Sequence, residues 1–153
     1  MVLGQVFSPK AIVAELESED KDEVFEELVE SMMSVQPNLN RESALTALRE
    51  RESKMSTGII HGIAVPHGIT DSVSGIQGAI GISHKGIDYD ALDNEPVNLV
   101  FMLLIAPDER ERHLQVLKTL SSVLQNADFI KTLLEKKTSQ EVYDAICAFE
   151  SEI

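Results

Sequence analysis

The sequence contains a single cysteine, Cys147, among its 153 residues. One thiol excludes a disulfide framework within the chain and also excludes a metal site built from cysteines. We interpret Cys147 as a small buried apolar side chain on the last helix. A zinc site built from histidines is also disfavoured, because their spacing is irregular and no H-E-x-x-H segment occurs. The histidines are His61, His67, His84 and His113.

Basic residues are scarce. There are 13 Lys and Arg residues against 26 Asp and Glu residues, which gives a formal net charge of −13. Nucleic acid is therefore excluded as a partner, because binding to phosphate backbones requires patches of Lys and Arg. The same charge argues against docking on anionic membranes. A partner protein with a basic docking face would instead associate faster with this chain.

Long hydrophobic runs are also missing. The longest, residues 97–106, is interrupted by Asn98 and is far too short to span a membrane. The chain does not open with a basic segment followed by an apolar one, so no signal peptide is expected. Neither a Walker-type glycine-rich loop nor a G-x-S-x-G segment is present, which disfavours nucleotide binding and a serine nucleophile. We expect a soluble cytoplasmic protein without membrane insertion.

What is present is an ordinary globular composition, with 43% hydrophobic and 25% charged residues. The length suits a single domain over residues 1–153. Apolar runs predict strands at residues 12–16, 63–65, 78–83 and 97–105. Helical spacing and capping residues predict helices at residues 20–34, 40–53, 108–126 and 127–137, and a last helix after the capping box at residues 138–141.

The order of these elements is strand, helix, helix, strands and then helices. A purely parallel sheet would need a helix between successive strands, and this order does not provide it. We therefore predict an α/β fold: a single layered domain in which a mixed, parallel and antiparallel, β-sheet is flanked by helices on both sides.

His67 is the most informative histidine. It follows Pro66 and precedes Gly68 at the end of a strand-like run, and the glycine is expected to let the backbone turn sharply and leave the ring open. One interpretation is a turn histidine without a role, which composition alone favours. The other is a nucleophile that reacts through one ring nitrogen while a backbone carbonyl holds the other as a donor.

Two further residues have a structural and a functional interpretation. His113 lies near the apolar stripe of Leu117, Leu120 and Leu124, and is either a hydrogen-bonded, partly buried histidine or a donor to phosphate oxygens near a helix start. Arg51 either belongs to a solvated helix end or pairs with phosphate oxygens through its planar guanidinium group.

The segment STGIIHGIAVPHG at residues 56–68 resembles the active-site motif of the fructose/mannitol-type enzyme IIA family, which includes the nitrogen-regulatory enzymes IIA. Arg51 and Glu52 stand where the family has an Arg-Glu pair. Further matches occur at residues 88–93, 96–101, 105–107 and 113–117, so the resemblance covers essentially the whole chain. Two positions depart from the pattern. The family usually has a small residue where Ile60 stands, and His61 occupies a variable position, so His61 is either incidental, which we favour, or near the site.

The resemblance implies a type 2 enzyme IIA of the bacterial phosphoenolpyruvate-dependent sugar phosphotransferase system, with a mixed sheet flanked by helices. It implies that Nε2 of His67 takes a phosphoryl group from the phosphocarrier protein HPr and passes it to an enzyme IIB. His113 would stabilise the phosphoryl group and the transition state, and Arg51 would support the phosphate. No metal, nucleotide or other cofactor is implied, because the donor is itself a phosphohistidine.

Three functions remain in competition. The first is a transport phosphocarrier for a sugar permease. The second is a nitrogen-type regulator whose phosphorylation state controls binding to target proteins. The third is a degenerate interaction domain, which the intact Pro66-His67-Gly68 segment disfavours. Neighbouring genes for an enzyme IIB and a permease would favour transport, whereas the identity of the sugar cannot be read from a chain that does not touch it.

Overall fold

The computed structural model describes residues 2–153, including all of their side chains except those of Ile59 and Ile60. These residues form one mixed sheet in the order β1-β5-β6-β3-β2, and β4 also pairs with β6. β5 is parallel to β1 and antiparallel to β6, whereas β3 and β4 are both parallel to β6. The strands are β1 (Phe7–Val13), β2 (Gly58–Ile60), β3 (Ile63–Ala64), β4 (His67–Ile69), β5 (Ile76–Ile87) and β6 (Val97–Ile105).

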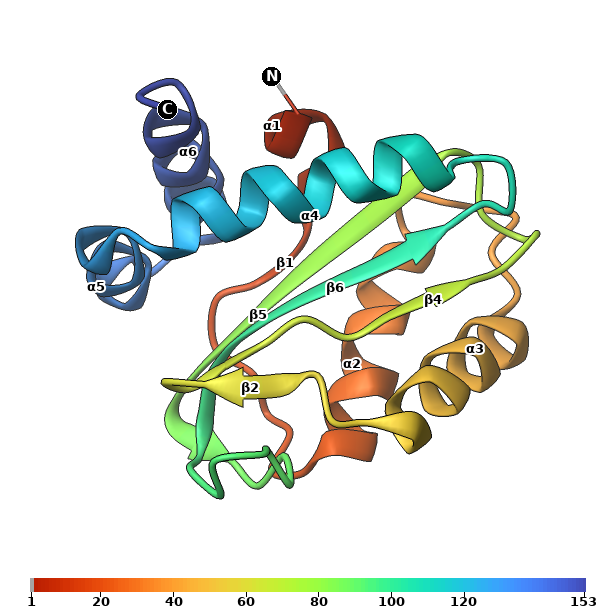
Figure 1. The fold of residues 1–153 in the computed structure, drawn as a ribbon, viewed down its shortest axis with the longest axis horizontal. Helices are drawn as coiled ribbons and strands as arrows, with labels where there is room; N and C mark the ends of the chain where they lie inside the picture. Colours follow the sequence, from red (N-terminus) through yellow and green to blue (C-terminus); the bar gives the residue numbers. More distant parts are fainter. Residues whose placement is uncertain (1) are drawn as a thin grey trace.

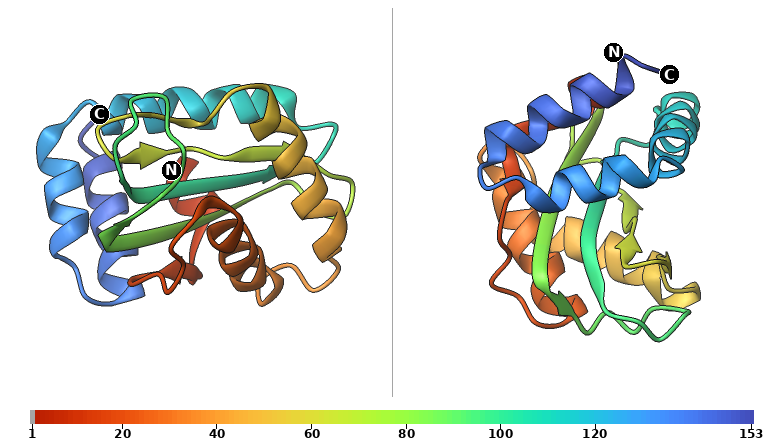
Figure 2. Two further views of the ribbon diagram at one scale, coloured as in Figure 1. Left: turned by 90° about the horizontal axis from the view of Figure 1, so that it is seen from below. Right: turned by 90° about the vertical axis from the view of Figure 1, so that its left-hand side faces the viewer.

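Helices cover both faces of this sheet. α2 and α3 enclose one core against it, and α1, α4, α5 and α6 enclose a second core on the other face (Figures 1 and 2). This arrangement confirms the predicted α/β fold with a mixed sheet flanked on both sides. The helices are α1 (Val2–Val6), α2 (Lys21–Met33), α3 (Arg41–Lys54), α4 (Arg110–Leu124), α5 (Ala127–Glu135) and α6 (Ser139–Glu150).

β6 joins the two cores because its successive side chains point to opposite faces of the sheet. Met102 and Leu104 pack with α2 and α3, whereas Phe101 and Leu103 pack with the helices of the other face. Both sets are buried. A strand covered on both faces reads as a continuous apolar run, which is the pattern that predicted it.

Helix starts were predictable because the capping chemistry is local. Asp20 accepts from the backbone N–H of Glu23 at the start of α2, and Asn40 does the same for Ser43 at the start of α3. Thr138 opens α6 with both hydrogen bonds of a capping box. The structure thus confirms the predicted starts of these helices.

Several predicted boundaries are wrong. The strand expected at residues 12–16 is β1, which begins at Phe7 and includes Pro9. Pro9 lacks a backbone N–H, but β1 lies at an edge of the sheet, where a missing donor is tolerated. β5 extends beyond the expected 78–83, and α1, β2 and β4 were not predicted. These last three elements have three to five residues each and show no periodicity to detect.

The apolar stripe expected on α4 is also partly wrong. Val116, Leu120 and Val123 are the buried residues, whereas Leu117 and Leu124 are half-exposed. α4 therefore has a core face and a second apolar face beside it. Cys147 lies on α6, as expected, but is only partly buried. Within residues 2–153, no helix has the length and apolar character that crossing a membrane requires.

Candidate functional site

His67 is the first residue of β4, not a turn residue. Pro66 separates β3 from β4, and its carbonyl accepts from the backbone N–H of Leu103 in β6. The Nδ1 atom of His67 lies 3.0 Å from the carbonyl oxygen of Val65. Because a carbonyl oxygen only accepts, Nδ1 carries the proton, and Nε2 is left with its lone pair. This is the arrangement that the nucleophile interpretation requires.

Gly68 has a different role from the one predicted. A Cβ atom at this position would lie 2.9 Å from the backbone carbonyl carbon of Ala47 and 2.9 Å from its Cβ atom. Gly68 continues β4 without a positive φ, so it does not provide a sharp turn. It allows α3 to approach β4 closely. Since α3 also carries Arg51, this contact holds Arg51 and His67 on two elements in direct contact.

His113 faces His67 from the beginning of α4. The two ring centroids are 5.4 Å apart, and the ring planes are inclined by 56°. The Nε2 atom of His113 is covered and has no hydrogen-bond partner among residues 2–153. Burial and the neighbouring His67 lower the pKa of His113 below its ordinary 6.5, which favours the neutral form of its ring. The hydrogen-bonded alternative for this nitrogen is therefore not what the structure has.

Arg51 lies in the last turn of α3, and its Nη1 atom donates to the carbonyl of Met55 at 2.9 Å. This bond satisfies an acceptor near the end of the helix, as the structural interpretation expects. However, Arg51 makes no ion pair with any carboxylate that the structure describes, whereas Arg49 pairs with Asp22 at 3.4 Å. The charge of Arg51 thus remains available to an anion.

A surface cavity of about 610 Å³ joins Arg51 to His67. One wall is apolar and comes from β3, the segment after it, α4 and α5: Ile63, Val65, Leu117, Leu120, Leu124 and Ile130. The polar residues of the lining are Arg51, Thr57, His61, His67, Ser121 and Gln125. The lining contains no Asp or Glu, although the chain has 26 of them. The cavity is therefore suited to an anion at its cationic end and to an apolar surface beside it.

His61 lies at this site, so of the two alternatives for His61 the structure supports the second. His61 and Gly62 have φ angles of 55° and 77° and connect β2 to β3 as a two-residue hairpin turn. Such turns need positive φ at both positions, and His is one of the residues that tolerate it. The effect of Ile60 on this loop concerns a side chain outside the described residues.

Glu52 belongs to the surroundings of the site, and no role was predicted for it. Its carboxylate is buried and accepts from the backbone N–H and the hydroxyl of Thr57. A signal was available in the sequence, because Ala44, Leu48 and Glu52 recur every four residues on the inner face of α3. A carboxylate that continues an apolar stripe indicates buried donors nearby.

Comparison with known proteins identifies one matching family and several similar chains. The family described as "Phosphoenolpyruvate-dependent sugar phosphotransferase system, EIIA 2" matches residues 5–148. The "PTS system fructose-specific EIIA component" of Haloferax volcanii is 43% identical over 107 residues, which cover 70% of each chain. The crystal structure of nitrogen regulatory protein IIA-Ntr from Neisseria meningitidis has a TM-score of 0.87 and 27% identity, covering 95% of this chain and 99% of that one.

A third similarity concerns the fold alone. The structure described as a complex of enzyme IIAMTL and phosphorylated enzyme IIBMTL from Escherichia coli matches with a TM-score of 0.77 and 21% identity. The match covers 94% of this chain and 99% of that one.

Among residues 2–153, no group of three or more His, Cys, Asp or Glu side chains is arranged to hold a metal ion.

Proposed function

Because the chain belongs to the EIIA 2 family of the phosphoenolpyruvate-dependent sugar phosphotransferase system, we propose that it is a cytoplasmic phosphocarrier that accepts a phosphoryl group on Nε2 of His67. The donor is phosphorylated HPr, and the acceptor is an enzyme IIB component in sugar uptake. Residues 1–153 act as one enzyme IIA domain. The observation that carries the proposal is the bond from Nδ1 of His67 to the Val65 carbonyl, which leaves Nε2 as the nucleophile in a cavity that Arg51 also lines.

The reaction exchanges one N–P bond for another. The Nε2 lone pair of His67 forms a bond to phosphorus as the N–P bond of the donor histidine breaks and its electron pair returns to the donor ring. The ring of His67 becomes more positive as this bond forms, and the Val65 carbonyl stabilises it through the Nδ1 proton. The next transfer reverses these roles, with His67 as the leaving group and the acceptor nucleophile of enzyme IIB attacking phosphorus.

Arg51 and His113 stabilise the charge on the phosphoryl oxygens. The transition state for phosphoryl transfer spreads negative charge over three equatorial oxygens, so catalysis consists mainly of positioning and charge stabilisation. Arg51 contributes a cation that pairs with no carboxylate among residues 2–153. His113 contributes an Nε2 atom that no group among residues 2–153 binds before the phosphoryl group arrives. Transfer therefore requires no metal or nucleotide in this scheme.

The apolar wall of the cavity is the docking surface for the partner proteins. Both partners must bring a reacting atom to His67, so both must cover the same surface in turn. The fold of a IIA protein solved in complex with a phosphorylated enzyme IIB supports an enzyme IIB as the second partner. The net charge of −13 favours partners whose rim is basic.

The second candidate function is regulation, in which the phosphorylation state of His67 controls binding to target proteins. The similarity to IIA-Ntr over nearly the whole of both chains supports it. The similarity to the fructose-specific EIIA component, at 43% identity, supports transport. Both functions use the same first step. They differ in the second, because a transport carrier must lose its phosphate rapidly to a cognate enzyme IIB.

The test is incubation with phosphorylated HPr, followed by intact mass measurement. We expect one acid-labile, base-stable phosphate on the wild type and none on His67→Ala. His84→Ala is the matched control, since it removes a histidine outside the cavity and should be labelled normally. Normal labelling of His67→Ala would remove His67 from its assigned role. Adding a purified fructose-type enzyme IIB then separates transport, with rapid loss of label, from regulation.

A further inference from the structure

Both carboxylate oxygens of Glu52, on α3, accept hydrogen bonds from Thr57. Its side chain is 5% exposed. Oε2 accepts from the backbone N–H of Thr57 at 2.8 Å, and Oε1 accepts from the hydroxyl of Thr57 at 2.6 Å. Bonds to an ionised acceptor are the stronger class of hydrogen bond, and here two of them hold one residue. The backbone and the side chain of Thr57 are thus fixed together.

Two further side chains complete the surroundings of this carboxylate. Lys21 from α2 lies 3.1 Å from Oε2 and supplies the opposite charge. The Tyr89 hydroxyl lies 2.8 Å from the Thr57 hydroxyl and donates to it, because the single proton of Thr57 is already donated to Glu52. Burial and the Glu52 carboxylate raise the pKa of Tyr89, so the phenol keeps the proton that it donates. The carboxylate therefore has a complete set of partners.

Thr57 connects this buried carboxylate to His67 through the backbone. The Thr57 carbonyl accepts from the N–H of Val65 at 3.1 Å. The Val65 carbonyl in turn lies 3.0 Å from Nδ1 of His67. Each group in this chain is fixed by the one before it. The orientation of the His67 ring, and the nitrogen that carries its proton, thus depend on where Thr57 is held.

The same anchor also affects Arg51. The segment between Glu52 and Thr57 contains Met55, whose carbonyl accepts from the Arg51 guanidinium at 2.9 Å. Glu52 closes this segment into a short loop by bonding to Thr57 across it. Releasing Thr57 would let Met55 move, and the guanidinium would move with it. One carboxylate thereby sets both the nucleophile and the phosphate-binding cation.

We propose that Glu52 is a positioning residue, which holds the His67 ring and the Arg51 guanidinium in the geometry for phosphoryl transfer by anchoring Thr57. This inference rests on the proposed function, because transfer at His67 is the activity that the anchor serves. Glu52 does not line the cavity and acts through Thr57, Val65 and Met55. The competing explanation is that Glu52 contributes to stability alone.

Glu150 provides a matched control for that explanation. Taken as a whole residue it is 8% exposed, the same fraction as Glu52, and it accepts backbone N–H bonds from Val2 at 2.7 Å and Leu3 at 3.0 Å. It lies on α6 and holds α1, and neither helix contributes to the cavity lining. A loss of a buried carboxylate without any effect on the site can therefore be measured with Glu150→Gln.

The experiment compares Glu52→Gln with Glu150→Gln in the full chain. Glutamine keeps the shape but replaces one acceptor oxygen with a donor, which cannot accept from Thr57 or pair with Lys21. We expect both variants to melt at lower temperature. Only Glu52→Gln should slow transfer from phosphorylated HPr, about 10-fold and in the rate constant rather than the KM, a typical effect for groups that orient a reacting ligand. In ¹⁵N NMR, only Glu52→Gln should shift His67 from the Nδ1–H tautomer towards the Nε2–H tautomer.

A wild-type rate and a wild-type His67 tautomer in a destabilised Glu52→Gln would overturn the inference and leave Glu52 a stabilising residue. If Glu52→Gln does not fold, Thr57→Val and Thr57→Ser decide, because serine keeps the hydroxyl and valine loses it. Serine should preserve the tautomer and valine should not, and equal behaviour of the two would also overturn it. A wild type that takes no label refutes the proposed function separately, while the NMR comparison still decides whether Glu52 sets the His67 ring.

Discussion

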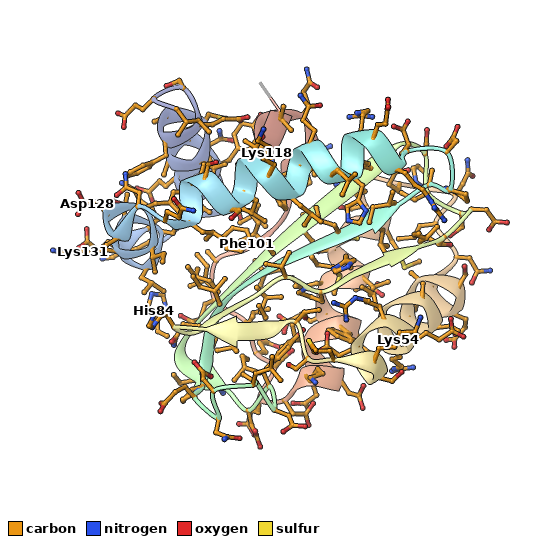
Figure 3. The ribbon with its side chains drawn as sticks, in the orientation of Figure 1. Lys54, His84, Phe101, Lys118, Asp128 and Lys131 are labelled. Carbon is orange, nitrogen blue, oxygen red and sulfur yellow. The ribbon has the colours of Figure 1, made fainter. Side chains whose placement is uncertain are left out.

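Two regions of the molecule hold histidines in opposite situations. His84, on β5, is 48% exposed, yet both of its ring nitrogens are bonded: Nδ1 to the Glu15 carboxylate and Nε2 to the Leu134 carbonyl at 2.6 Å. His113 is partly buried, yet its covered Nε2 atom has no partner among the described residues. Figure 3 shows His84 beside α5, at the end of the molecule away from Lys54, the last residue of α3.

Exposure alone would favour His84 over His113 as a candidate site residue, whereas the hydrogen bonds of the two rings favour His113. Folded proteins bond the great majority of their buried polar atoms, so a covered nitrogen without a partner needs an explanation. His84 bonds an acidic side chain near β1 and the end of α5, which is a stabilising arrangement. His113 instead faces the nucleophile of the proposed reaction. Under the proposed function, the missing hydrogen bond of His113 points to the site, whereas the exposure of His84 does not.

The strongest test of this contrast is a pair of alanine substitutions. His113→Ala should keep the fold and slow transfer by about 10²–10³-fold, the usual range for electrostatic or acid–base groups. His84→Ala should do the reverse, lowering the melting temperature and leaving the transfer rate unchanged. Rapid-quench kinetics beside thermal melts measure both. A destabilised His113→Ala that transfers at the wild-type rate would place His113 with His84 as a structural residue.

Arginines on α3 extend the comparison with a smaller expected effect. Arg51→Lys keeps the charge but loses the planar fork, so transfer should slow by roughly 10- to 100-fold, equivalent to about 1.5–3 kcal/mol for a charged hydrogen bond. Arg49→Lys is the control, because Arg49 pairs with Asp22 and Glu26 on the surface. Transfer rates measured under single-turnover conditions decide. Equal rates for Arg51→Lys and the wild type would assign Arg51 to the helix end alone.

The smallest effect concerns the dependence of stability on pH, which should have opposite signs for the two histidines. The Leu134 carbonyl and Glu15 raise the pKa of His84 above its ordinary 6.5, so its contribution is complete below 6.5 and is lost as pH rises through the folded value. Burial and His67 lower the pKa of His113 below 6.5. Its neutral form is favoured in the fold, so stability falls as pH drops from 6.5 through the folded value.

Urea unfolding at several values between about pH 5 and 8 measures these slopes. His84→Ala should remove part of the decline above 6.5, and His113→Ala part of the decline below it. The effect of His84 should be modest, because water screens a half-exposed ion pair. Slopes of the same sign for the two histidines would contradict the difference between their surroundings.

Sequence patterns were sufficient to predict elements that depend on a nearby capping residue or on a long apolar run. The starts of α2, α3 and α6 depend on caps a few residues away, and β6 was recognisable because it is apolar on both faces. β2 and β4 could not be predicted in this way. Each has three residues, and each exists because it pairs with a strand that the chain forms elsewhere. Pairing partners are a property of the whole fold, which periodicity does not contain.

The candidate site likewise has features that the sequence predicted and features that depend on the whole fold. His67, Arg51 and His113 were singled out from the sequence, and the structure brings the first two to one cavity and the third to the face of His67. Their roles remain predictions. The reason for Gly68 was predicted wrongly, because its constraint comes from Ala47 across the fold rather than from its own backbone. The sequence also could not identify the Val65 carbonyl as the partner of Nδ1 of His67, because every residue has a backbone carbonyl.

The absence of carboxylates from the cavity lining has a further consequence. Before transfer, Arg51 is the only Lys, Arg, Asp or Glu side chain in the lining among residues 2–153. A phosphoryl group on His67 would add about −1.5 to −2 and make the local sum negative. A partner protein would then meet potentials of opposite sign on the same apolar surface, depending on whether His67 is phosphorylated. The electrostatic potential of this surface would thus distinguish the phosphorylated from the unphosphorylated protein without any change of shape.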